Sequence, residues 1–106
     1  MEELKLEQKL AIIDSIINYM NDAGLLYESH YITDIIKYIP TCKVLCGLSK
    51  YDFKVVFPEL YSVITDPTIH VSNDYDFNEH NAYGFNTHRI IMLNNIKSYL
   101  LSLKAN

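Results

Sequence analysis

Apolar residues recur three or four positions apart near both ends of the 106-residue chain. They are Leu6, Leu10, Ile13, Ile17 and Met20 within residues 3–23, and Ile90, Leu93, Ile96, Leu100 and Leu103 within residues 88–103. This spacing places the apolar side chains on one side of an α-helix. The pattern predicts a first helix over 3–23 that stops at Gly24 and a last helix over 88–103 that Thr87 caps.

Two shorter helices are predicted next along the chain. Isoleucines at helical spacing favour a helix over 29–39, which Pro40 ends because the residue before a proline avoids helical geometry. Isoleucine is β-branched, so a strand is the alternative for this segment. A third helix is expected from Thr41, as its cap, through Cys46, with Gly47 as its stop.

The next segment contains a clear helix start signal. Ser49 and Asp52 have the spacing of a capping box, which predicts a helix from Ser49 to Phe57. Pro58 cannot continue an unbroken helix, but it suits the first position of a new one. A short further helix is therefore predicted over 58–64.

Residues 66–86 break the helical pattern. They are rich in Asn, Asp and His and carry two aromatic pairs with period-two spacing, Tyr75 and Phe77, then Tyr83 and Phe85. Such a stretch predicts a small hairpin or an ordered loop. The whole sequence, residues 1–106, therefore predicts a single all-α domain, a compact bundle of about four to five helices with this insertion before the last helix.

Composition narrows the class of protein. Nine Lys and Arg against 13 Asp and Glu give a net charge of −4, and Gly and Pro are too few for a low-complexity chain. The start of the chain lacks the pattern of a signal peptide, and no apolar run is long enough to span a bilayer. We therefore expect a cytoplasmic protein without membrane association, in which Cys42 and Cys46 are reduced core residues.

The insertion contains only partial matches to known metal-binding motifs. Residues 74–78 resemble the opening of a calcium loop, but Glu79 and Phe85 stand where that loop needs Gly and a bidentate Glu. Three histidines match no short zinc-binding spacing: His70, His80 and His88. No nucleophile motif or phosphate-binding loop occurs either. The sequence therefore predicts no catalytic residue, no metal site and no cofactor, with a small metal-dependent enzyme as the less favoured reading.

A helix-turn-helix is the main alternative reading of residues 41–57. Gly47 would form the turn, and Lys50, Tyr51 and Lys54 would face the DNA groove. The acidic net charge and a single arginine in the chain argue against a nucleic-acid partner.

The same region resembles a group of short uncharacterised phage and mobile-element proteins. The similar features, within about residues 44–95, are Gly47-Leu48-Ser49, Asp52-Phe53, Phe57-Pro58-Glu59-Leu60, Tyr83-Gly84-Phe85 and Arg89. This chain lacks the Trp that such proteins often have. A composition with 13 Ile and one Arg also indicates an AT-rich genome. The resemblance implies a phage or mobile-element origin and brings no established activity.

These observations favour a non-enzymatic protein that binds a host protein and inhibits a defence system. Tyrosine and phenylalanine are enriched at protein interfaces, so the expected contact surface is Tyr75, Phe77, Tyr83 and Phe85, with burial of these rings in the bundle as the alternative. Broad apolar stripes on the first and last helices also predict a homodimer.

Overall fold

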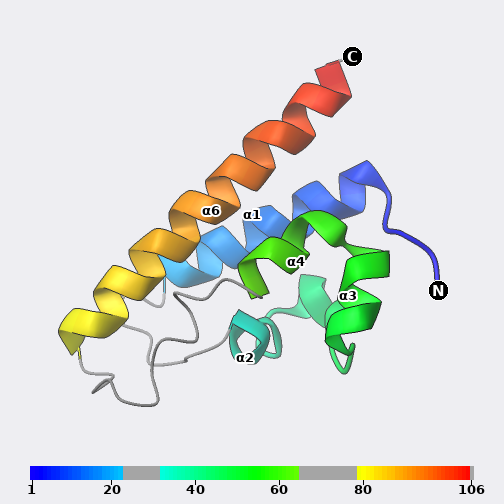
Figure 1. The fold of residues 1–106 in the computed structure, drawn as a ribbon. Coiled ribbons are helices and arrows are strands. Elements are labelled where there is room, and N and C mark those ends of the chain that lie inside the picture. The colour runs from blue at the N-terminus through cyan, green and yellow to red at the C-terminus, as the bar shows by residue number, and fades with distance from the viewer. Residues whose placement is uncertain (23–31, 65–78, 106) are drawn as a thin grey trace.

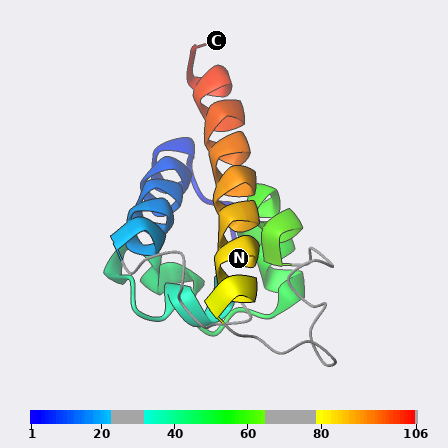
Figure 2. The same cartoon turned by 90° about the vertical axis from the view of Figure 1, so that its left-hand side faces the viewer.

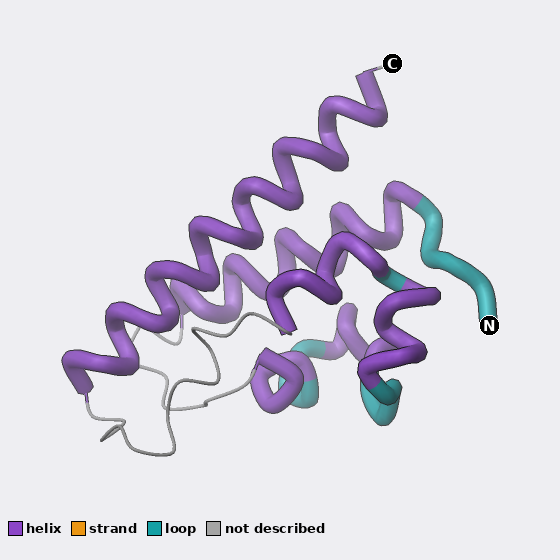
Figure 3. Tube along the Cα trace, viewed as in Figure 1, coloured by secondary structure: helices purple, strands orange, loops and turns teal. Residues whose placement is uncertain are grey.

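Helices form every regular element in the part of the chain that the computed structural model describes (Figures 1 and 3). The structure describes the backbone of residues 1–22, 32–64 and 79–105 and the side chains of these residues except 34 and 79–87. The elements are α1 (Leu6–Asp22), α2 (Ile32–Ile36), the 3₁₀ helix η1 (Pro40–Leu45), α3 (Lys50–Val56), α4 (Pro58–Ile64) and α6 (Glu79–Ala105). The predicted all-α bundle is confirmed.

The first and last helices form the long axis of the bundle. Helix α6 packs antiparallel against α1, and α4 lies on the other side of α6 (Figure 2). Two ion pairs join α1 and α6, between Lys97 and Asp14 at 2.7 Å and between Lys104 and Glu7 at 3.1 Å. Both predicted long helices are therefore present. Most of each apolar stripe is buried or partly buried against the other elements, whereas Leu103 at the end of the last helix is 43 % exposed.

The capping box and the proline predicted for α3 and α4 are both confirmed. The hydroxyl of Ser49 accepts a hydrogen bond from the backbone N–H of Asp52, and the Asp52 carboxylate accepts one from the N–H of Ser49. Pro58 then starts α4 directly after α3. Phe57 links the two helices and is fully buried, so the change of direction is fixed by an aromatic ring in the core.

The segment before α3 differs from the prediction in two ways. Helix α2 ends at Ile36, because the chain is already extended at Ile39, the residue that precedes Pro40. Pro40 itself occupies the first turn of η1, so the prediction that Thr41 caps an α-helix is wrong. Gly47 has a φ of 80° after this helix, which confirms it as the stop.

Helix α6 starts well before the predicted residue. The backbone is helical from Glu79, so the prediction of a loop or hairpin is wrong for residues 79–86, and Thr87 lies inside the helix rather than at its cap. Asn, His and Gly84 have low helix propensity and favoured a loop. An existing helix can nevertheless extend over such residues, since propagation needs no new nucleus. Residues 65–78 lie outside the described part of the chain.

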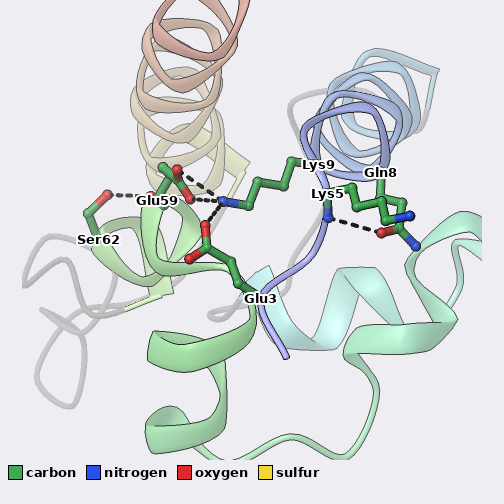
Figure 4. Close-up of polar contacts among 6 residues, drawn as sticks. All are labelled: Glu3, Lys5, Gln8, Lys9, Glu59 and Ser62. Carbon is green, nitrogen blue, oxygen red and sulfur yellow. Dashed lines mark hydrogen bonds and ion pairs between the residues drawn. The ribbon is translucent and has the colours of Figure 1, made fainter. Parts of the chain in front are cut away.

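A buried lysine ties α1 to α4 and to the N-terminal segment (Figure 4). The Nζ atom of Lys9 donates to Glu59 Oε1 at 2.8 Å and Oε2 at 3.1 Å, and it also pairs with Glu3. The same ammonium lies 5.5 Å from the centre of the Phe57 ring. The N–H of Leu4 donates to the carbonyl of Val56 at 2.9 Å, so residues before α1 are fixed to the end of α3.

The contacts of Lys9 with Glu3 and Glu59 raise its pKa by more than burial lowers it. Burial alone would lower the pKa of Lys9, but hydrogen bonds and charges from Glu3 and Glu59 raise it, and the net pKa lies above the ordinary value of 10.5. Lys9 is therefore fully charged at neutral pH while enclosed by protein.

Candidate protein-binding groove

A groove opens on the surface between α1 and η1. In a 3₁₀ helix, residues three apart share a side, so the buried Cys42 and Leu45 leave Thr41 and Val44 together on an outer side of η1. The facing surface of α1 comes from residues at i, i+3 and i+4 spacing. The groove is lined by Gln8, Ala11, Ile12, Thr41, Lys43 and Val44 and has a volume of about 500 Å³.

The lining combines an apolar floor with a polar rim. Ile12 is buried, Ala11 is exposed, and the side chain of Val44 is 52 % exposed. The side-chain oxygen of Gln8 accepts a hydrogen bond from the N–H of Lys5 at 3.0 Å. The side-chain amide N–H groups of Gln8 can donate hydrogen bonds to a partner. Figure 4 shows Gln8 and Lys9 on opposite sides of α1, so the groove is separate from the Lys9 cluster.

Positive charge is available at this groove. The lysines on the long helices are neutralised, since Lys9, Lys97 and Lys104 each form an ion pair with a carboxylate. Within the described residues, no acid lies within ion-pair distance of Lys43, which is exposed. The groove therefore suits a partner that supplies an apolar side chain and a nearby carboxylate.

The aromatic surface predicted from the sequence is not brought together in the described structure. Tyr75 and Phe77 lie outside the described residues. The backbone of Tyr83 and Phe85 belongs to α6, but their side chains are not described. The α1–η1 groove was not predictable from the sequence, because an α-helix over 41–46 would turn different residues outward.

The residues of the DNA-binding alternative lie on α3. Lys50 and Lys54 are exposed one turn apart, and Tyr51 between them is largely exposed. The Lys54 ammonium lies 5.9 Å from the centre of the Tyr61 ring, at the edge of α4. The element before the turn is a 3₁₀ helix, and α3 has seven residues, about 10 Å of helix. A recognition helix of that length reaches few base edges.

The two cysteines differ in their surroundings. Cys42 is buried, and burial together with the nearby Cys46 raises the pKa of its thiol to about 12. Cys46 is exposed, so the prediction that it is a core residue is wrong, and its sulfur lies 3.8 Å from the carbonyl oxygen of Cys42. A thiol with this pKa is almost wholly protonated at neutral pH, so Cys42 is a packing residue rather than a nucleophile.

Two buried cations were missed by reasoning from the sequence, although their spacing contains a signal. Lys9 continues the buried series Ile13, Ile16 and Met20 by one step of four. Arg89 does the same for the buried series Leu93, Ile96 and Leu100 and is itself fully buried. A long cation at a core-facing position of a helix predicts either a buried polar contact or an extended side chain that reaches solvent.

The chain matches no known protein in three kinds of comparison. No family model matches the chain, and neither curated proteins nor solved structures include a match. Among the described residues, no group of three or more His, Cys, Asp and Glu side chains could hold a metal ion. No helix in that part of the chain has the length and apolar character to cross a membrane.

Proposed function

We propose that this chain is a non-enzymatic binding protein that attaches to a partner protein through the α1–η1 groove. The observation that carries this proposal is the half-exposed Val44 beside a buried Ile12 floor, with Gln8, Thr41 and Lys43 as hydrogen-bonding groups at the rim. Mixed apolar and polar composition is typical of interfaces that form and dissociate.

The resemblance noted in the sequence supports a proposal for the kind of partner. Similarity to short phage and mobile-element proteins, together with the AT-rich composition, supports a bacterial host protein as the partner, with a defence-system component as the target class. The protein would then act in the cytoplasm of the host cell. The partner surface should offer an apolar side chain next to an acidic residue, because Lys43 borders the groove.

Val44→Asp should weaken capture of this partner, because it places a carboxylate on the apolar side of the groove. We expect at least about 10-fold weaker binding, the scale of a disrupted interface anchor. Tagged wild-type protein and the variant are incubated with lysate of a low-GC bacterium, and captured proteins are quantified by mass spectrometry. Tyr51→Asp is the matched control, since Tyr51 is also exposed but lies on α3.

The result that contradicts the proposal is a capture profile that Val44→Asp leaves unchanged. The same assay tests the aromatic surface predicted from the sequence, with the variants Tyr75→Ala, Phe77→Ala and Tyr83→Ala. If only these variants lose capture, the binding surface is the aromatic segment and not the groove.

Duplex DNA remains the second candidate partner, because Lys50 and Lys54 are exposed one turn apart and no described acid pairs with them. We expect no salt-sensitive duplex binding by the wild type, since a chain of net charge −4 repels a polyanion. Fluorescence anisotropy with a random duplex at two salt concentrations checks this. Micromolar binding that Lys50→Glu and Lys54→Glu together remove would favour the DNA-binding function instead.

A further inference from the structure

Charge is distributed unevenly along the chain. Residues 35–58 contain four lysines and one aspartate, a net charge of +3 in a chain whose total is −4, so the other residues together carry −7. All four lysines are exposed, and we name them the basic side: Lys37, Lys43, Lys50 and Lys54. Figures 1 and 2 show the elements that carry or adjoin them, α2, η1 and α3, along one side of the bundle, away from the C-terminal end of α6.

The one acidic residue of this segment is engaged within its own helix. Asp52 is half-buried, and its carboxylate accepts a hydrogen bond from the N–H of Ser49 at 3.3 Å. Within the described residues, no acid lies within ion-pair distance of Lys43, Lys50 or Lys54. The ion pairs on the neighbouring elements use other lysines: Glu3 and Glu59 pair with Lys9, Asp14 with Lys97 and Glu7 with Lys104. The basic side therefore offers its positive charge to a partner.

Apolar side chains are exposed among these lysines. Tyr38 is 64 % exposed, Val44 is 52 % exposed and Tyr51 is 75 % exposed. Each of the three directly follows a lysine of the basic side in the sequence. A lysine next to an exposed apolar or aromatic group provides a charge contact and an apolar contact at neighbouring positions. The basic side therefore suits a partner that combines carboxylates with apolar side chains.

We infer that the partner binds through a short acidic segment of its chain that lies along the basic side. Carboxylates of the segment contact the lysines, and an apolar side chain contacts Val44. This inference deepens the proposed function and rests on it, because Lys43 and Val44 also line the α1–η1 groove. Opposite charges guide such a segment to this side of the molecule and away from the acidic remainder.

A short acidic segment fits this charge distribution better than a nucleic acid does. An extended segment of about eight residues spans about 26–29 Å. The molecule measures 26 Å along its middle axis, so a segment of this length can stay on the basic side. A nucleic acid carries charge on every unit and would continue past the basic side toward residues that together carry −7. The basic side also contains no arginine, the residue best suited to bidentate phosphate contacts.

Fluorescence anisotropy with the full chain tests the inference, using a labelled peptide of sequence Asp-Glu-Leu-Glu-Asp-Leu-Glu-Asp. The wild type should bind this peptide at least about 10-fold more tightly than a neutral peptide in which Asn and Gln replace the acids. The Kd for the acidic peptide should rise at least about threefold between about 0.05 M and about 0.5 M salt, because contacts between exposed charges are screened.

Lys50→Gln combined with Lys54→Gln should raise the Kd for the acidic peptide at least about 5-fold, the effect of losing two exposed charge contacts. Lys97→Gln combined with Lys104→Gln is the matched control, since it removes the same charge from α6, outside the basic side. The control should leave the Kd within about twofold of the wild-type value. Val44→Ser removes the apolar contact without adding charge and should raise the Kd about threefold.

Three results would overturn the inference. These are equal binding of the acidic and neutral peptides, equal effects of the two pairs of lysine substitutions, and tighter binding of a labelled thymidine oligonucleotide of equal length, which would assign the basic side to a nucleic acid. An effect of Val44→Ser without one of Lys50→Gln and Lys54→Gln contradicts the inference but supports the groove of the proposed function. The reverse pattern supports the inference and contradicts the groove. Far-UV circular dichroism verifies that each variant remains helical.

Discussion

Phe57→Ala is expected to destabilise the domain by about 3–5 kcal/mol. The ring is fully buried between α3 and α4 and lies beneath the Lys9 ammonium. Its removal leaves a cavity at the point where the chain changes direction, and the backbone there cannot easily collapse. The Phe57 N–H donates to the carbonyl of Phe53 at 2.8 Å, and its own carbonyl accepts from Leu60 at 3.1 Å. A small domain has a total stability of about 5–15 kcal/mol, so this loss is a large share of it.

Urea unfolding followed by circular dichroism measures the effect of Phe57→Ala. Tyr51→Ala is the control, because that ring is exposed and its loss should change the free energy of unfolding by about 0.5 kcal/mol or less. Phe57→Leu refills most of the volume and should recover much of the loss. A change below about 1 kcal/mol for Phe57→Ala would contradict the central place of this ring in the core.

Lys9→Met should lower the free energy of unfolding by about 1–3 kcal/mol at neutral pH, the range for hydrogen bonds to charged groups. Methionine keeps the aliphatic packing of the lysine but loses the contacts with Glu3 and Glu59. The pKa of Lys9 in the folded protein is raised above its ordinary value of 10.5. The stabilisation is therefore complete below pH 10.5 and is lost as the pH rises through the folded-state pKa.

The measurement is the difference in unfolding free energy between wild type and Lys9→Met across a pH series. We expect a constant difference up to about pH 10 and a decreasing one above it. Lys5→Met is the control at an exposed position and should show little difference at any pH. A difference that does not change at alkaline pH would show that the contribution of Lys9 is packing rather than charge.

Local signals in the sequence predict much of the fold. Apolar spacing located α1 and most of α6, and the capping box at Ser49 and the proline at position 58 defined the starts of α3 and α4. These features act within a few residues and depend little on the rest of the chain. The true start of α6 was missed, because weak helix formers joined an already formed helix.

Features that depend on distant residues were not predictable in this way. Nothing near Lys9 in the sequence indicates that Glu59 will accept its hydrogen bonds, since the two are brought together by the packing of α1 and α4 on α6. The α1–η1 groove has the same origin, because it requires η1 to be a 3₁₀ helix that lies against α1. The site predicted from the aromatic residues remains untested, since their side chains lie outside the described residues.

The pairing of α1 with α6 has a consequence for how the protein matures during synthesis. Helix α1 is translated before α6, and α6 is made after the elements α1 and α4 that pack on it. Until α6 is available, the apolar sides of α1 and α4 have no complete cover, and the lysines that pair with Glu7 and Asp14 have not been translated. Long-range contacts of this kind must wait for closure of a large chain loop. Completion of the bundle is therefore expected in one late step, after α6 has been translated.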